Sequence, residues 1–206
     1  MYIVFEGIVG SGKSTQSKRL VAFLREKYGA DKIIHVREPG STPIAEDIRT
    51  LAQGKEWENE SMHPLTNAYL YAAARAQTLH TVVKPALEDG KIVISDRSFL
   101  SSCAYQGEAQ GLGINTILAV NEEAIRDILP DRVFYMDIDV EVSLSRTFDA
   151  VGDKWEKMGK EFFQSIVRGY DKCEKLEIME NRFIRIDARG TQDDIFQNIL
   201  IQVDSI

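Results

Sequence analysis

The sequence predicts an α/β protein built on a doubly wound, five-stranded parallel sheet that is flanked by helices. Two observations carry this prediction. Short β-branched runs alternate with long helical patterns along the 206 residues, and these runs are apolar almost throughout. Strands that helices cover on both faces have such continuous apolar runs, as Ile92-Val93-Ile94 illustrates. We therefore expect strands at residues 2–5, 32–36, 91–95, 132–137 and 182–186, with helices between them.

Polar and charged residues follow several of these runs directly. They are Glu6, Arg37, Glu38, Pro39, Asp96, Arg97 and Asp187. Because ligands of open parallel sheets bind outside the carboxyl ends of the strands, we expect these residues to lie along one functional edge. The chain shows no internal repeat, linker or low-complexity tract, so we expect one domain over residues 1–206.

The composition excludes several classes of protein. With 44% hydrophobic and 28% charged residues the chain is ordinary for a globular protein, and no apolar stretch approaches the roughly 20 residues of a membrane span. The net charge of −7 disfavours a nucleic acid polymer as partner. Cys103 and Cys173 lack metal-type spacing, and we expect buried thiols rather than ligands; the histidines are His35, His63 and His80. We expect a cytoplasmic protein with no membrane partner.

A glycine-rich turn follows the first predicted strand and opens the first helical pattern. It fits the spacing G-x-x-x-x-G-K-[ST], whose backbone N–H groups cradle the phosphates of a nucleoside triphosphate. The predicted ATP-binding residues of this turn are Gly7, Ile8, Val9, Gly10, Ser11, Gly12, Lys13, Ser14 and Thr15. We expect Lys13 to reach the β- and γ-phosphates and Ser14 to hold Mg²⁺.

An acid and a base stand together after the third predicted strand. We expect Asp96 to orient the water ligands of Mg²⁺ and Arg97 to hold a phosphate. Transfer of a phosphoryl group needs positive groups where charge spreads in the transition state, and Lys13, Mg²⁺ and Arg97 provide them. Taken alone, Asp96 and Arg97 also fit a helix cap followed by a solvated arginine. Beside a phosphate-binding turn on the same edge, we interpret them as catalytic.

Five blocks extend the pattern over nearly the whole chain. They are Phe5-Glu6-Gly7 with the turn, Arg37-Glu38-Pro39-Gly40 with Thr42-Pro43-Ile44, Ala73-Ala74-Arg75-Ala76-Gln77, Asp96-Arg97 with Ser101 to Gly107, and Phe134-Tyr135-Met136-Asp137-Ile138-Asp139. In this order and spacing the chain resembles the thymidylate kinases, a family of the nucleoside monophosphate kinase group. The resemblance implies a P-loop kinase that phosphorylates dTMP to dTDP with ATP and Mg²⁺, for dTTP synthesis. Homodimers packed through helices are also implied.

The resemblance assigns roles to the acceptor side. It implies that Tyr71 stacks on thymine, although core packing is the alternative for this helical residue. Arg75 would donate to O4 of the base, Ser102 would face N3, and Tyr105 would crowd C2′ and so favour deoxynucleotides. Arg97 would hold the acceptor phosphate. The implied substrate-binding residues are Glu38, Pro39, Tyr71, Arg75, Arg97, Ser102, Tyr105 and Gln106.

The resemblance also implies a lid at about residues 146–160 that closes over the triphosphate. Its element Asp153-Lys154-Trp155-Glu156 carries lysine where the family usually has arginine, so Lys154 is the first candidate for a catalytic lid cation. Arg146, Lys157 and Lys160 are further candidates, and Arg146 is also expected to bind ATP. Arg189 lies in a loop that resembles the one along adenine.

Three positions depart from the family pattern. Val9 stands where relatives carry Asp or Glu that faces the 3′-hydroxyl of the acceptor, Ala74 replaces an acid, and Ser98 replaces an aromatic residue. All three changes concern the acceptor side, whereas the donor residues are intact. They leave two alternatives to dTMP phosphorylation: a same-fold kinase acting on dUMP, a 5-modified pyrimidine or another deoxynucleoside monophosphate, and a nucleotide-binding regulator without transfer activity.

Overall fold

The protein is built on a five-stranded parallel sheet with the strand order β2-β3-β1-β4-β5. The structure, a computed structural model, describes residues 1–54, 60–146 and 158–204. The strands are β1 Tyr2–Glu6, β2 Ile33–Arg37, β3 Ile92–Asp96, β4 Arg132–Asp137 and β5 Phe183–Asp187. Each lies within one residue of its predicted bounds, so the predicted fold class is confirmed.

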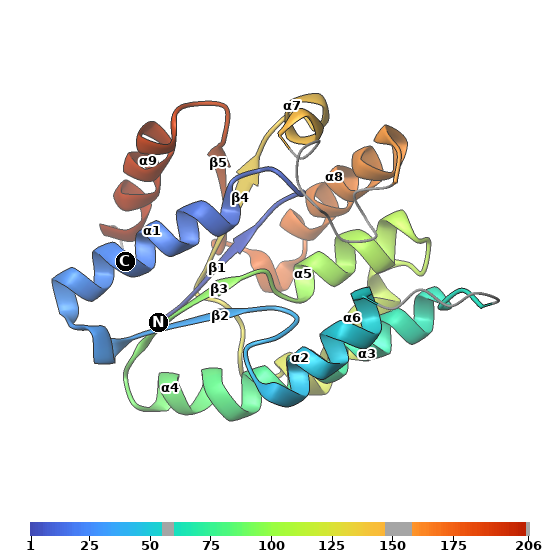
Figure 1. Cartoon of the computed structure of the whole chain (residues 1–206), viewed down its shortest axis with the longest axis horizontal. Coiled ribbons are helices and arrows are strands. Elements are labelled where there is room, and N and C mark those ends of the chain that lie inside the picture. The colour runs from blue at the N-terminus through green and yellow to red at the C-terminus, as the bar shows by residue number, and fades with distance from the viewer. Residues whose placement is uncertain (55–59, 147–157, 205–206) are drawn as a thin grey trace.

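Helices cover both faces of this sheet. The α-helices are α1 Lys13–Tyr28, α2 Pro43–Arg49, α3 Pro64–Thr78, α4 Lys84–Glu88, α5 Phe99–Ser102, α6 Ile114–Ile125, α7 Val140–Ser145, α8 Lys160–Glu174 and α9 Gln192–Asp204. The other helical segments are the 3₁₀-helices η1 Ala30–Lys32 and η5 Glu177–Met179 and the π-helices η2 Thr50–Gly54, η3 Leu79–Val83 and η4 Cys103–Ala109. Helices α1 and α9 lie on one face, and α3, α4 and α6 lie on the other (Figure 1). Strands and helices alternate along the chain, as predicted, because each parallel strand is connected to the next through helices on one face of the sheet or the other.

The central strand β1 places the functional turn. All five of its residues are buried, and it pairs in parallel with both β3 and β4. In this register Phe5 lies opposite Asp96 on one side and opposite Phe134 on the other. The backbone N–H of Arg97 then donates to the carbonyl of Phe5 at 2.9 Å. The turn after β1 and the pair after β3 are therefore neighbours, as the sequence predicts.

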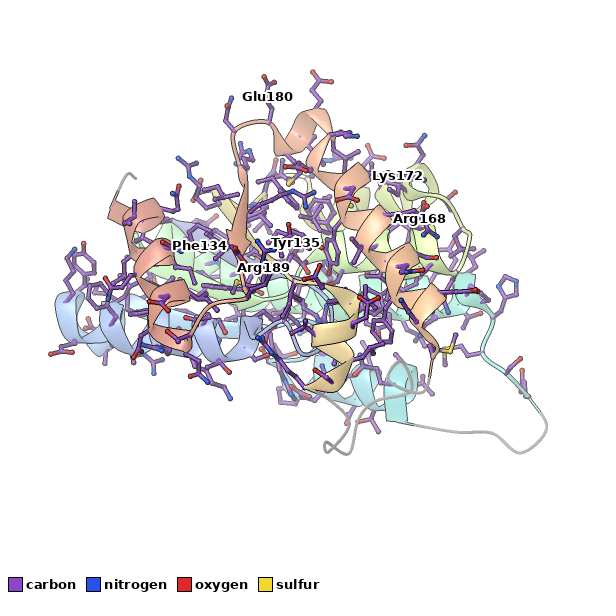
Figure 2. The ribbon with its side chains drawn as sticks, turned by 90° about the horizontal axis from the view of Figure 1, so that it is seen from above. Phe134, Tyr135, Arg168, Lys172, Glu180 and Arg189 are labelled. Atoms are coloured by element: carbon purple, nitrogen blue, oxygen red, sulfur yellow. The ribbon has the colours of Figure 1, made fainter. Side chains whose placement is uncertain are left out.

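Helix α8 packs closely against the turn η4. Its buried residues Phe163, Ile166, Gly169, Tyr170 and Cys173 recur at helical spacing and form one face. Figure 2 shows Arg168 and Lys172 along the side of α8 that faces away from Tyr135 of β4. A Cβ atom on Gly169 would lie 2.6 Å from the Cα of Ala104, so only glycine permits this approach of the two backbones.

Both cysteines are free and buried, as the prediction of buried thiols requires. Cys103 belongs to η4 and Cys173 to α8, so the two thiols lie at the contact between these segments. Within the described ranges, no helix is long and apolar enough to cross a membrane.

We predict that Gly169→Ala destabilises the protein. The added methyl group meets backbone atoms of Ala104 rather than a flexible side chain, so the free energy of unfolding should fall by about 1–3 kcal/mol. Gly159→Ala is the control, because a Cβ atom there meets nothing within 4 Å; since Gly159 is the N-cap of α8, the change should lower the stability by less than about 1 kcal/mol. Denaturant unfolding measures both variants. Equal stabilities of the two variants would contradict the close packing of α8 on η4.

Candidate active site

In the glycine-rich turn between β1 and α1, the side chain of Lys13 folds back and bonds to the backbone of the turn. Lys13 is only 7% exposed, and its Nζ donates to the carbonyl oxygen of Ile8 at 3.2 Å, across the turn. Gly7 has φ 147°, and a Cβ atom there would lie 2.7 Å from Oγ of Ser11, so a side chain has no room. Gly12, with φ 88°, turns the chain into α1. The turn is thus shaped to present backbone N–H groups at the N-terminus of a helix.

A first cavity lies over this turn, and we call it the donor cavity. It is lined by Gly10, Ser11, Gly12, Lys13, Ser14, Thr15, Gln16, Arg146, Gly190, Thr191, Gln192 and Ile195. Nε2 of Gln16 donates to the carbonyl of Gln192 at 2.9 Å and ties α1 to the start of α9. Most of the predicted ATP-binding residues therefore lie around one space, together with Arg146, which is exposed.

Arg189 lies beside this space rather than in it. Its guanidinium donates to both carboxylate oxygens of Asp187, each at 2.8 Å, and these contacts lower the pKa of Asp187 to about 2. The two side chains line a neighbouring cavity with Asp137, Asp139 and Arg185. The adjacent Gly190 does line the donor cavity. A contact between ATP and this loop is thus supported for the backbone of Gly190 rather than for the side chain of Arg189.

Ser14, which lines the donor cavity, contacts Asp96 at the end of β3. The Ser14 hydroxyl donates to Oδ2 of Asp96, while the buried Oδ1 of Asp96 has no hydrogen-bond partner in the described part of the chain. Mg²⁺ at phosphate sites keeps several waters and uses only one or two protein oxygens. A hydroxyl beside a carboxylate with an unused oxygen fits that requirement. The described residues contain no larger cluster of His, Cys, Asp and Glu placed to bind a metal.

A second cavity opens on the other side of the turn, and we call it the acceptor cavity. It is lined by Val9, Glu38, Pro39, Gln53, Tyr71, Arg75, Arg97, Ser98, Ser101, Tyr105 and Gln106. Every predicted substrate-binding residue except Ser102 is in this set. The hydroxyl of Ser102 is buried and accepts from Arg75 at 3.2 Å, so Ser102 lies behind Arg75.

Arg75 is 2% exposed and is held by four hydrogen bonds. Its Nε donates to Glu38 at 2.6 Å, its Nη1 donates to Asn121, and its Nη2 donates to the carbonyl of Ser98 and to Ser102. Burial raises the pKa of the Glu38 carboxyl, and the charge of Arg75 opposes that shift. Four of the five N–H donors of the guanidinium are used by the described residues, which fixes its plane at the cavity wall.

The aromatic residues of the acceptor cavity are also held by polar contacts. The hydroxyl of Tyr71 accepts from Nε2 of Gln53 at 2.7 Å, and Tyr71 lines the cavity rather than packing wholly into the core. The ring of Tyr105 lies 5.3 Å from the guanidinium carbon of Arg97. Gln53 belongs to none of the blocks in the sequence, and its role depends on the position of α3.

Arg97 lines the acceptor cavity, and neutral groups hold its guanidinium there. Its Nη1 donates to the carbonyl of Gly7 at 3.2 Å and to the hydroxyl of Ser101 at 2.8 Å, and its Nη2 donates to the hydroxyl of Tyr105 at 3.4 Å. It makes no ion pair with any residue that the structure describes. Burial opposes its charged form, yet Tyr105, Tyr170 and Glu6 raise the pKa of Arg97 above its usual value. A charged guanidinium at a cavity wall that makes no ion-pair contact with a described residue suits a phosphate.

Two of the three departures from the family pattern line the acceptor cavity. Val9 is half-buried there, and Ser98 both caps α5 and donates to Glu6 at 2.8 Å. Ala74 is fully buried and is not among the lining residues. Val9 is therefore the departure that changes the chemistry of the cavity surface most directly, from a carboxylate to an apolar group.

Lys154 and Lys157, and with them most of the predicted lid, lie outside the described residues. Lys160 is described, at the start of α8, where its ammonium pairs with Glu141 of α7. Of the two predicted lid cations in the described part of the chain, Arg146 lines the donor cavity and Lys160 does not.

A phosphate-binding turn with a second, arginine-lined cavity beside it defines a P-loop kinase with a small acceptor. Comparisons with known proteins narrow this class. The thymidylate kinase family model matches residues 5–199. A thymidylate kinase of Fervidobacterium nodosum is 43% identical, with 97% of this chain and 96% of that one aligned. A thymidylate kinase of Chlorobium chlorochromatii is 36% identical over 100% of this chain and 95% of its own length.

A solved structure gives the same result. The crystal structure of thymidylate kinase from Ehrlichia chaffeensis superposes with a TM-score of 0.78 at 30% sequence identity, covering 98% of each chain. The chain therefore belongs to the thymidylate kinase family, and the resemblance stated from its motifs is confirmed.

We predict that Glu38→Gln destabilises the protein by about 3 kcal/mol or more, because it leaves the buried Arg75 without a counter-charge. Glu46→Gln is the matched control. Glu46 pairs with Arg37 at 2.8 Å on the surface, where such a pair contributes less than about 1 kcal/mol. Thermal and denaturant unfolding compare the two variants. A Glu38→Gln variant as stable as the control would show that Arg75 does not depend on this carboxylate.

Proposed function

We propose that this protein transfers the γ-phosphoryl group of ATP to dTMP, forming dTDP and ADP, as a step toward dTTP. One observation carries the proposal: a single turn lines both cavities. Gly10 to Thr15 line the donor cavity, and the preceding Val9 lines the acceptor cavity. A donor phosphate and an acceptor phosphate bound in these cavities approach each other across the turn. Proximity of this kind supplies much of the rate enhancement in phosphoryl transfer.

The residues around the two cavities bind different parts of the reacting groups. Lys13 and the backbone N–H groups of the turn bind the β- and γ-phosphates, and Arg97 binds the acceptor phosphate. Ser14 and Asp96 would hold Mg²⁺, which when bound neutralises charge on the phosphate oxygens. Protein groups that are fixed in advance stabilise the charge of the transition state without reorganisation. We further propose Lys154 as the lid cation that completes this set.

The acceptor cavity suits a deoxynucleotide with a thymine-like base. Tyr71 offers a ring for stacking, and its hydroxyl bond to Gln53 holds that ring in place. Arg75 is locked by Glu38 and Asn121, and a remaining N–H suffices for one carbonyl of the base. Tyr105 lies beside Arg97, near the expected sugar, where its ring excludes bulk.

We propose in addition that residues 1–206 form one kinase domain with a lid at about 146–160, that the active form is a homodimer, and that it works in the cytoplasm. The match of the family model to residues 5–199 supports the single domain. The homodimer rests on the resemblance to the family.

A panel of nucleoside monophosphates tests the proposed function. With ATP and Mg²⁺, the purified protein should form ADP with dTMP at the highest kcat/KM, and removal of Mg²⁺ with a chelator should stop the reaction. Turnover of dUMP or another deoxynucleotide without any turnover of dTMP would contradict the proposal. Absence of turnover with every acceptor would instead indicate a nucleotide-binding regulator.

Val9 provides a second test. We predict that Val9→Asp raises kcat or lowers the KM for dTMP, by about tenfold or more, because a carboxylate at the cavity wall adds a charged hydrogen bond to the acceptor. Val142→Asp adds the same charge at an exposed position of α7 and should leave the kinetics unchanged. Loss of activity in Val9→Asp would show that the cavity is built around an apolar group and that its acceptor is not ordinary dTMP.

A further inference from the structure

Glu6 is a buried carboxylate with five hydrogen-bond donors around it. It ends β1 and is fully buried. Its Oε1 accepts from the backbone N–H of Ser98 at 2.7 Å, the hydroxyl of Ser98 at 2.8 Å and the backbone N–H of Ser101 at 3.2 Å. Its Oε2 accepts from the hydroxyls of Ser101 at 2.7 Å and Tyr170 at 2.8 Å. No lysine or arginine in the described ranges forms an ion pair with it.

These contacts determine how the surrounding hydroxyl groups are oriented. An ionised carboxylate can only accept, so the single hydroxyl hydrogens of Ser101 and Tyr170 both point at Oε2. Their lone pairs are then directed away from Glu6. Nη1 of Arg97 donates toward these same oxygens, at 2.8 Å to Ser101 and 3.5 Å to Tyr170. Glu6 therefore turns two hydroxyls into acceptors for Arg97.

The same carboxylate supports the backbone of Arg97. Arg97 has φ 77°, a left-handed conformation that is uncommon for residues other than glycine. The segment that follows Arg97 is held by Glu6, which accepts from the backbone N–H groups of Ser98 and Ser101. A strained backbone persists only where its surroundings hold it in place, and Glu6 supplies part of that hold.

We propose that Glu6 is a positioning residue for the acceptor phosphate: it orients the hydroxyls of Ser101 and Tyr170 so that they hold the guanidinium of Arg97 at the acceptor cavity without neutralising it. The proposal rests on the proposed function, in which Arg97 binds the acceptor phosphate. A carboxylate in direct contact with Arg97 would compete with the phosphate for the same N–H donors. Neutral hydroxyls between them keep the position of the guanidinium and leave its charge to the substrate.

Tyr170 connects this network to a distant part of the chain. It belongs to α8, and its ring packs 4.9 Å from the ring of Tyr135 on β4. Tyr135 is also buried, but its hydroxyl makes no hydrogen bond with a described residue. The two tyrosines thus share an environment and differ in whether the hydroxyl belongs to the network, which makes Tyr135→Phe a matched control for Tyr170→Phe.

Steady-state kinetics of Glu6→Gln and Tyr170→Phe test the proposal. In Glu6→Gln the amide oxygen must face the two backbone N–H groups, so the amide NH₂ faces the hydroxyls of Ser101 and Tyr170 and reverses them. We expect kcat/KM for dTMP to fall by about tenfold or more in Glu6→Gln and by several fold in Tyr170→Phe. The KM for ATP should stay within about twofold of the wild-type value in both, and Tyr135→Phe should match the wild type throughout.

A double variant separates orientation from simple loss of a contact. In the Glu6→Gln background, Tyr170→Phe should cause a smaller fold-loss than it causes in the wild type, because the hydroxyl that it removes is no longer oriented toward Arg97. Additive losses would overturn the proposal. The proposal would also be overturned if kcat and the KM for dTMP in the variants stayed within about twofold of the wild-type values. It would likewise be overturned if the variants lost affinity for ATP and for dTMP equally and also lost thermal stability.

The assay also distinguishes this inference from the proposed function. All variants are measured with the monophosphate that the wild type phosphorylates best, so a wild-type preference for an acceptor other than dTMP contradicts the proposed function and leaves the test of Glu6 intact. If Glu6→Gln does not fold, Tyr170→Phe with its Tyr135→Phe control decides the outcome alone.

Discussion

The parallel pairing of β1 with β3 and β4 is the constraint on which the site depends. Because all three strands run in the same direction, the segments that leave their carboxyl ends meet at one edge. The register that sets Phe5 opposite Asp96 brings the phosphate-binding turn next to Arg97. The donor cavity, the Ser14 and Asp96 pair and the acceptor cavity are consequences of this arrangement, and helices on both faces make the strands too buried to shift.

The site contains two arginines, the buried Arg75 and the half-buried Arg97, and their charges have opposite kinds of partner. Arg75 contacts the carboxylate of Glu38, so it is nearly neutralised and serves as a fixed wall with directed N–H groups. Arg97 contacts hydroxyls and a carbonyl, and its charge remains for an anion. A buried charge must be satisfied by hydrogen bonds, but the choice of partner decides whether it binds a base or a phosphate.

The acceptor side is assembled from elements that are far apart in the sequence. Gly169 lets α8 approach η4 closely, and this approach carries the hydroxyl of Tyr170 to Glu6 and Ser101. Gln53 reaches Tyr71 from η2, and Asn121 reaches Arg75 from α6. The geometry of the acceptor cavity therefore depends on how the helices pack in the core, because the same helices supply the side chains of both.

The sequence by itself determined the strands, their parallel direction, the phosphate-binding turn and the place of Asp96 and Arg97 at the same edge of the sheet. Each of these is encoded within a few neighbouring residues, as an apolar run or a spacing of glycine, lysine and serine. Only the tertiary structure decided that Ser102 lies behind Arg75, that the side chain of Arg189 turns to Asp187, and that Glu6 organises Ser101 and Tyr170. These roles depend on partners up to 164 residues apart in the chain, and no local pattern records which distant side chain will complete a hydrogen bond.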